Sequence, residues 1–140
     1  MIRQMRSIAL AALVAACGSA TPTTAPASPG AAQIQLSQAP ADLGCDAMGV
    51  AYREVTFRID PTAVEQVTAI TNTGASLRTF WSAGFRGGSA DEKVVRDPSG
   101  AIVAADGEVL GIPQGAWPRL HGYFVCPSPE ALYVLIQDPT

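Results

Sequence analysis

The sequence predicts a small all-β domain, and two observations support this. Short apolar segments recur from Val50 to the end of the chain and are separated by Gly, Pro, Asn and Asp, the pattern that strands and turns give in sandwiches and barrels. No segment of helix length keeps an apolar period of about 3.6 residues. We therefore expect a small antiparallel sandwich of immunoglobulin-like type, with a small OB-like β-barrel as the alternative.

The first expected strands follow from alternation and from β-branched residues. Residues 55–59 alternate apolar and polar side chains, as a half-buried strand does. Asp60-Pro61 fits the start of a helix, but we favour a capped turn at 60–63. The β-branched segment 67–71 then ends at Asn-Thr-Gly, a turn signal that predicts a hairpin with the segment after it.

The later strands follow from turn chemistry. Asp97-Pro98-Ser99-Gly100 places proline second and glycine fourth, as in a type I turn, and predicts a hairpin. The last segment, 131–136, is apolar at nearly every position, which predicts a central strand with both faces covered. The remaining expected strands cover residues 77–81, 94–96, 101–104, 109–110 and 122–126.

The first sixteen residues have the composition of a secretory signal. Arg3 and Arg6 lie in a start without acidic residues, and an apolar run from Ile8 to Ala16 follows. This run is far shorter than the ~20 residues that a transmembrane helix needs. A charged start, a short apolar middle and small residues before a processing point are typical of such a signal.

The segment Leu13-Val14-Ala15-Ala16-Cys17 resembles a lipobox, the recognition sequence of bacterial lipoprotein signal peptidase. The resemblance implies cleavage before Cys17, diacylglycerol on its sulfur and fatty acylation, such as palmitate, of the new amino terminus. It implies a lipoprotein held at the cell membrane or the outer membrane, with its domain on the extracytoplasmic side. The membrane is then a partner through the lipid on Cys17.

These features divide the chain into a signal peptide at 1–16, a tether at 17–38 and a single β domain at 39–140. The tether is rich in Pro, Ala and Thr and carries no charge. Such a stretch cannot bury enough apolar surface to offset its ordering entropy, so we expect it to be disordered.

Cys45 and Cys126 are the cysteines that remain once Cys17 is acylated. Compartments outside the inner membrane permit disulfides, so we expect these two residues to pair and to join the beginning of the domain to its end. The alternative is a reactive thiol, which needs a base beside it. The single histidine, His121, gives only a weak argument for a catalytic pair with Cys126.

The composition argues against several classes of function. Without Arg3 and Arg6, seven basic residues face twelve acidic ones, a net charge of −5. This charge disfavours nucleic-acid binding, because phosphate backbones are bound by clustered Lys and Arg. No nucleophile elbow, phosphate-binding loop or metal motif occurs, and we expect His121 to begin a strand. We therefore expect no catalytic residue, no metal and no cofactor, and a protein that is not an enzyme.

Two loops pair tryptophan with arginine, at residues 81–88 and 113–119. These residue types dominate binding hot spots, so the loops form a candidate binding surface if they lie at one end of the domain. The alternative is that Trp81 and Phe85 complete the core. The candidate surface residues are Trp81, Phe85, Arg86, Trp117 and Arg119.

Together these features predict a membrane-tethered binding or scaffolding module whose partner is an envelope protein or a small ligand. Two alternatives come from other classes. One is an inhibitor of an extracellular hydrolase such as lysozyme, and the other is a small hydrolase that uses acidic residues and His121.

Overall fold

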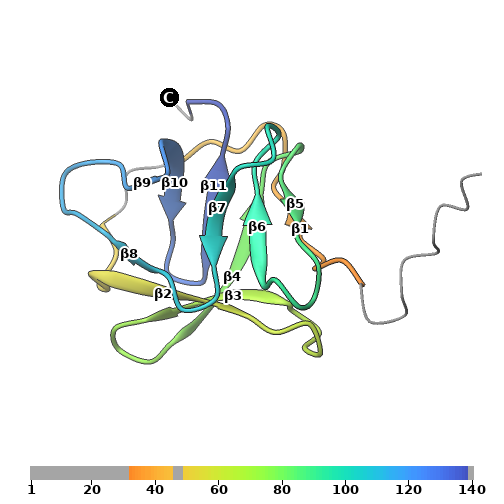
Figure 1. Cartoon of the computed structure of the whole chain (residues 1–140). Helices are drawn as coiled ribbons and strands as arrows, with labels where there is room; N and C mark the ends of the chain where they lie inside the picture. Colours follow the sequence, from red (N-terminus) through yellow and green to blue (C-terminus); the bar gives the residue numbers. More distant parts are fainter. Residues whose placement is uncertain (1–31, 46–48, 139–140) are drawn as a thin grey trace, which may run out of the picture.

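A computed structural model describes residues 32–45 and 49–138, which form strands and turns (Figure 1). The prediction of an all-β fold is confirmed. This part of the chain contains no helix long and apolar enough to cross a membrane. The expected signal peptide, Cys17 and most of the expected tether lie outside the described residues.

The strands belong to a large sheet and a small one. Those of the large sheet are β1 (Ser37–Gln38), β2 (Glu54–Ile59), β3 (Val67–Thr71), β4 (Ser76–Trp81), β8 (Val109–Gly111), β9 (Arg119–Leu120), β10 (Tyr123–Pro127) and β11 (Ala131–Leu135). Those of the small sheet are β5 (Arg86–Gly87), β6 (Val94–Arg96) and β7 (Ile102–Ala105).

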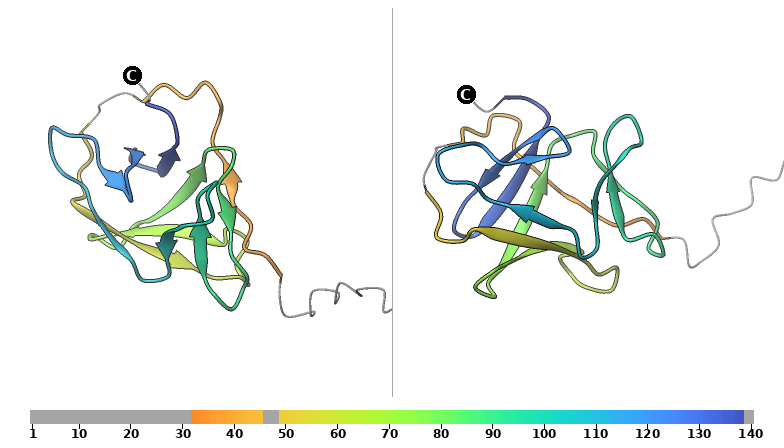
Figure 2. Two further views of the ribbon diagram at one scale, coloured as in Figure 1. Left: turned by 45° about the horizontal axis from the view of Figure 1, so that its top comes forward. Right: turned by 60° about the vertical axis from the view of Figure 1, so that its left-hand side comes forward.

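The large sheet runs in the order β8-β2-β3-β4-β11-β10-β9, and β1 pairs with β4. Strand β4 lies parallel to β11 and to β1, whereas the other pairs in the described chain are antiparallel. The sheet curls around the interior, and β5, β6 and β7 stand beside it (Figure 2). The domain therefore combines features of the sandwich and of the nearly closed barrel.

The local predictions that rest on turn chemistry are confirmed. The Thr62 amide donates to Asp60 Oδ1 at 2.9 Å, which caps the turn between β2 and β3. The Gly100 amide donates to the Asp97 carbonyl at 2.9 Å and closes the hairpin of β6 and β7. Strand β11 lies between β4 and β10, the central position that its continuous apolar sequence predicts.

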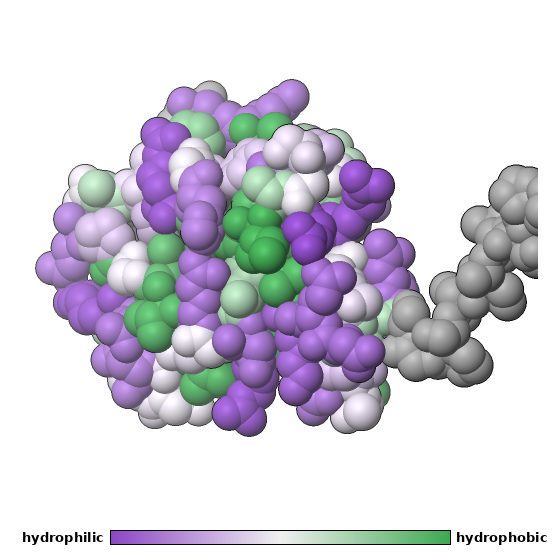
Figure 3. Space-filling model, viewed as in Figure 1, coloured by the Kyte–Doolittle hydropathy of each residue, from purple (hydrophilic) through white to green (hydrophobic). Residues whose placement is uncertain are grey.

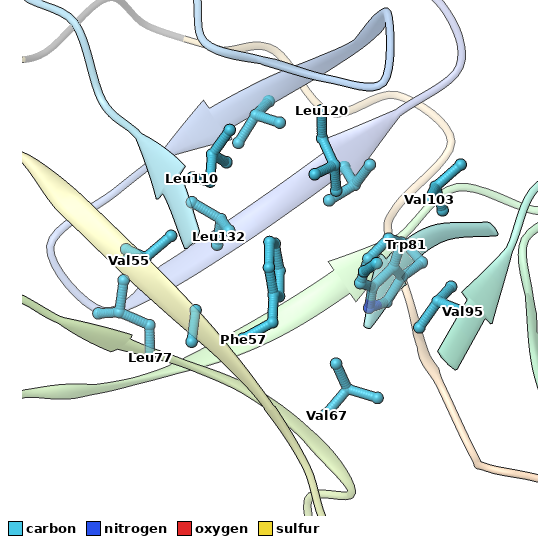
Figure 4. Packing of buried hydrophobic residues seen from close by; sticks show 14 of the residues in the cluster. Val55, Phe57, Val67, Leu77, Trp81, Val95, Val103, Leu110, Leu120 and Leu132 are labelled. Carbon is cyan, nitrogen blue, oxygen red and sulfur yellow. The ribbon is translucent and has the colours of Figure 1, made fainter. Parts of the chain in front are cut away.

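The core fills the space inside the curled sheet (Figure 4). Val55, Phe57 and Ile59 on β2 are almost completely buried, because the two-residue period of a strand points all three side chains inward. Side chains from β4 and β11, such as Leu77 and Leu132, meet them from the other side. Burial of this apolar surface is the main stabilising term of the fold.

The folded domain begins earlier than residue 39. Ile34 is 2% exposed and its amide donates to the Gly88 carbonyl at 2.8 Å. Ser37 and Gln38 form β1 beside β4. The expected boundary of the tether at residue 38 is therefore wrong for residues 32–38. Ala32, Ile34 and Leu36 alternate there with polar residues, a short strand-like pattern that the composition of the whole stretch conceals.

Large apolar side chains at the surface are dispersed. The exposed ones are Val64 between β2 and β3, Ile102 on β7, Val109 on β8 and Ile136 after β11. On the face shown in Figure 3, apolar residues are interspersed with hydrophilic ones. Single exposed apolar residues of this kind need no partner to explain them.

Candidate functional site

Two of the predicted surface residues, Trp81 and Phe85, lie in the core. Trp81 is 1% exposed and Phe85 is 7% exposed. Trp81 occupies an inward position of β4, where its indole Nε1 donates to Thr79 Oγ1 at 3.0 Å and its ring contacts Phe85. These two side chains present no surface to a partner, which corrects their assignment to the candidate binding surface.

The other three predicted residues are accessible but are not brought together. Arg86 lies in the small sheet opposite Arg96. Arg119 lies on β9, with its guanidinium 3.8 Å from the centre of the Phe124 ring. The connection between β8 and β9, which carries Trp117, lies on the opposite side of the molecule from β5 in both Figure 1 and Figure 2. The two loops therefore do not form one surface.

The connection between β8 and β9 instead lines a pocket of its own. The pocket has a volume of about 400 Å³, which lies within the range of small-molecule sites. Its walls come from the segment before β2, from the connection itself and from the end of β10. The lining residues are Gly49, Val50, Arg53, Ile112, Pro113, Gln114, Gly115, Ala116, Trp117, Pro118 and Pro127.

One wall of the pocket is fixed by the pairing of β2 with β8. Glu54 lies opposite Gly111, and the Ile112 amide donates to the Arg53 carbonyl at 2.8 Å. The Arg53 amide in turn donates to Asn72 Oδ1 at 2.9 Å. The backbone that carries Arg53 is therefore held on both sides, and its side chain leaves from a rigid position.

Tyr52 anchors the same wall to the connection between β10 and β11. It is 5% exposed and its hydroxyl donates to the Ser128 carbonyl at 2.8 Å. Burial raises the pKa of Tyr52 to about 12, against a smaller lowering by this hydrogen bond. The hydroxyl therefore remains a hydrogen-bond donor at every physiological pH.

Another part of the pocket lining is built around Trp117. Its half-buried ring packs in a second apolar cluster on the outer side of the sheet, together with Phe124 and the disulfide of Cys45 and Cys126. The Val125 amide donates to the Pro118 carbonyl at 3.0 Å and fixes the chain just after the tryptophan. Trp117 therefore stands on a supported base while part of its surface faces the pocket.

The disulfide between Cys45 and Cys126 is present, as predicted. The two Cα atoms are 5.9 Å apart and the bridge spans 81 positions of the chain. For a loop of this length the chain-entropy estimate of stabilisation is about 4 kcal/mol. The bridge joins Cys45, which precedes the first pocket residues in the sequence, to β10, which also carries the pocket residue Pro127.

The pocket is apolar with one cationic group. Among the described residues that line it, Arg53 alone carries a charge. The Arg53 guanidinium donates to the Val50 carbonyl at 3.2 Å, and to Gln114 Oε1 at 3.1 Å with the amide turned so that its oxygen faces the arginine. Both acceptors are neutral, and no acidic residue of the described lining offsets the positive charge of Arg53.

His121 does not begin a strand, contrary to the expectation. It has a positive φ of 47° and, with Gly122 at 87°, forms a tight turn between β9 and β10. Positive φ at both central positions is the requirement of a type I′ hairpin turn. His121 Nε2 lies 2.7 Å from Glu108 Oε1, a contact between two turns that are distant in sequence.

The acidic residues do not gather into a metal site in residues 32–45 and 49–138. No group of three or more His, Cys, Asp or Glu side chains lies close enough there to hold an ion. Asp97 instead accepts a hydrogen bond from the Ser99 amide within its own turn, at 2.9 Å, and Asp106 accepts one from the Ile59 amide at the end of β2, at 2.8 Å.

The sequence pointed to the pocket loop that carries Trp117 but not to the pocket segment that carries Arg53. Trp117 was singled out and Gln114 lies in the same predicted loop, at 113–119, whereas Arg53 was not identified. Nothing in the residues around Arg53 marks it, because its place beside Gln114 depends on the pairing of β2 with β8. The signal would have been the register of that pair, which local sequence does not contain.

Comparison with protein families, curated proteins and solved structures finds no match to this chain. The function is therefore argued from the geometry of the pocket.

Proposed function

We propose that this protein is a membrane-tethered extracytoplasmic lipoprotein whose β domain is a ligand-binding module, with the pocket beside Trp117 as its binding site. The observation that carries the proposal is a cavity of about 400 Å³ that is lined by both Trp117 and Arg53, each held in place by its own contacts. Apolar pockets with a few convergent polar groups are the usual form of small-ligand sites.

Two further features support a tethered module. The disulfide fits an oxidising compartment outside the cytoplasm, and the lipobox-like segment at residues 13–17 precedes a polar, proline-rich stretch. The described chain starts, at residue 32, on the side of the molecule opposite the connection between β8 and β9 (Figures 1 and 2). A tether attached there does not obstruct the pocket.

The binding site is tested by filling the pocket without disturbing the core. Ala116 is exposed and lines the pocket, so Ala116→Leu should reduce the volume available to a ligand. Ala101→Leu, at an exposed position of the hairpin of β6 and β7, is the matched control. In a screen of small organic compounds, we expect A116L to weaken the hits at least tenfold, about 1.4 kcal/mol, and A101L to leave them unchanged. Equal binding by both variants contradicts the assignment of the pocket.

The tether is tested by mass spectrometry of the protein isolated from membranes. We expect an amino-terminal peptide that begins at Cys17 and carries the mass of a diacylglycerol and a fatty acid. A Cys17→Ser variant should lose both the modification and the membrane fraction. An unmodified peptide that contains the leader contradicts the lipoprotein assignment.

A further inference from the structure

The charge distribution of the pocket narrows the class of ligand that it can bind. The protein as a whole is acidic, with twelve Asp and Glu against nine Lys and Arg. The described lining of the pocket nevertheless contains one cation and no acid. A cation beside an apolar wall is complementary to a molecule that joins an apolar body to one negative charge.

Arg53 is available for such a charge. The ion pairs within residues 32–45 and 49–138 join Arg78 to Glu65, Arg96 to Glu92 and His121 to Glu108. Arg53 belongs to none of them and bonds only the Val50 carbonyl and the Gln114 amide. A guanidinium has five N–H donors in a planar fork that matches a carboxylate, so donors remain for an incoming anion.

The apolar lining of the pocket indicates what the uncharged part of the ligand should be like. Val50, Ile112 and Trp117 face the cavity together with three prolines, and none of these side chains offers a second charge. The hydrogen bond from the Tyr52 hydroxyl to the Ser128 carbonyl, and the one from the Arg53 amide to Asn72, keep this wall in place. Preorganisation of this kind reduces the entropy that binding costs.

We propose that the pocket binds a small amphipathic carboxylate, with the carboxylate on Arg53 and an alkyl or aryl body against Trp117. This inference rests on the proposed function and specifies its ligand class. A free small acid is favoured over the end of a protein chain because the cavity, at about 400 Å³, matches a small molecule.

The test uses three probes that share one chain and differ in the head group: octanoate, 1-octanol and octylammonium. Binding to the purified full chain is measured by calorimetry, and occupancy of the pocket is read from the fluorescence of Trp117. We expect octanoate to bind about tenfold more tightly than octanol, which corresponds to about 1.4 kcal/mol, and octylammonium to bind most weakly. Added salt should weaken octanoate alone.

Variants of arginine identify the group responsible. Arg53→Gln should reduce the affinity for octanoate to that for octanol, and Arg53→Lys should fall between because ammonium lacks the bidentate fork. Arg86→Gln is the matched control: it makes the same change of charge at an exposed position of β5. Thermal unfolding of each variant checks that it is folded, which the exposure of Arg53 predicts.

The outcomes separate the two proposals. If octanol and octanoate bind equally and Trp117 responds, the pocket is a binding site but the anion inference is overturned. If no probe binds, both proposals fail. If Arg86→Gln weakens octanoate as much as Arg53→Gln, the effect is one of net charge and the inference is overturned. Tighter binding of a short apolar peptide with a free carboxyl end also overturns it, because the ligand is then a chain end.

Discussion

At the scale of residues, Asp97 joins the small sheet to the large one. Asp97 is 7% exposed and stands at the turn of β6 and β7. Asp97 Oδ1 accepts from the Ser99 hydroxyl at 2.6 Å, and Oδ2 accepts from the Tyr123 hydroxyl on β10 at 2.8 Å. The Ser99 hydroxyl is the main cause of a lowered pKa of Asp97, against the opposing effect of burial. The hydrogen bond from the Tyr123 hydroxyl to Asp97 raises the pKa of Tyr123.

The lowered pKa of Asp97 predicts a stability that falls in acid. A carboxyl with a folded-state pKa below its usual value of 3.8 stabilises the fold fully above that value, and the contribution is lost as pH falls through the folded-state pKa. Asp97→Ala should lower the thermal midpoint at pH 7. Asp97→Asn should lower it less and should give a shallower decline below about pH 4 than the unchanged protein.

Thermal unfolding followed from pH 7 to pH 3 checks this prediction. Asp91→Asn is the control, because the Asp91 side chain is exposed and makes no hydrogen bond or ion pair within residues 32–45 and 49–138. An acid decline of Asp97→Asn as steep as that of the unchanged protein contradicts the role given to Asp97.

The two tryptophans show what sequence can and cannot say about a site. Both stand near glycine and arginine in similar loops, yet Trp81 is 1% exposed and Trp117 is half-buried at the pocket. Trp81 is the last inward position of β4, so the alternation of that strand already favoured the core for it. Trp117 lies in the connection between β8 and β9, outside any strand, and only the tertiary structure places it in the same pocket as Arg53.

At the scale of elements, strands with local patterns were predictable and strands without them were not. The alternation in residues 55–59 and the turn at 97–100 identify β2 and the hairpin of β6 and β7. Strands β1, β5 and β9 have two residues each. Two residues carry no period. In addition, β1 pairs with β4, which is distant in sequence.

Glycine 87 shows how one of these short strands is held. It is buried in β5, and a Cβ added there would overlap with the carbonyl group of Ile34. The N-terminal segment of the domain therefore packs directly on the backbone of β5. Glycine is required for this close approach and not for a turn.

Gly87→Ala should push the segment around Ile34 away from β5. We expect the free energy of unfolding to fall by about 1–3 kcal/mol, the usual cost of overpacking. Gly111→Ala in β8 is the control, because nothing lies within 4 Å of its added Cβ. It should change stability by less than about 1 kcal/mol, in the favourable direction, since alanine reduces the entropy of the unfolded chain. Equal effects in urea unfolding would show that the contact with Ile34 is unimportant.

At the scale of the whole molecule, two connections fasten the N-terminal part of the described chain to the rest of the domain. The bridge of Cys45 and Cys126 fastens the early part of the domain to β10, and Ile34 fastens its start to β5. A low-complexity stretch therefore passes into the fold within a few residues. The composition of residues 17–38 placed the start of the domain too late, because an average over that stretch does not register the buried Ile34.

Truncation tests where the domain starts. A chain that begins at Ala32 should be as stable as the full chain, whereas one that begins at Ala39 lacks Ile34 and β1. Loss of a buried isoleucine alone costs about 2–5 kcal/mol, so the shorter chain should have a markedly lower midpoint in urea. Equal midpoints for the two chains would place the start of the domain at residue 39 after all.

The indole N–H signals of the two tryptophans give the most direct test of the binding module. In a titration of the ¹⁵N-labelled protein with octanoate, the Trp117 signal should move and saturate. The Trp81 signal should stay fixed, because that indole is buried and bonded to Thr79. A Trp117→Phe variant assigns the signals. Movement of Trp81 alone, or of neither signal, would contradict a ligand site between Arg53 and Trp117.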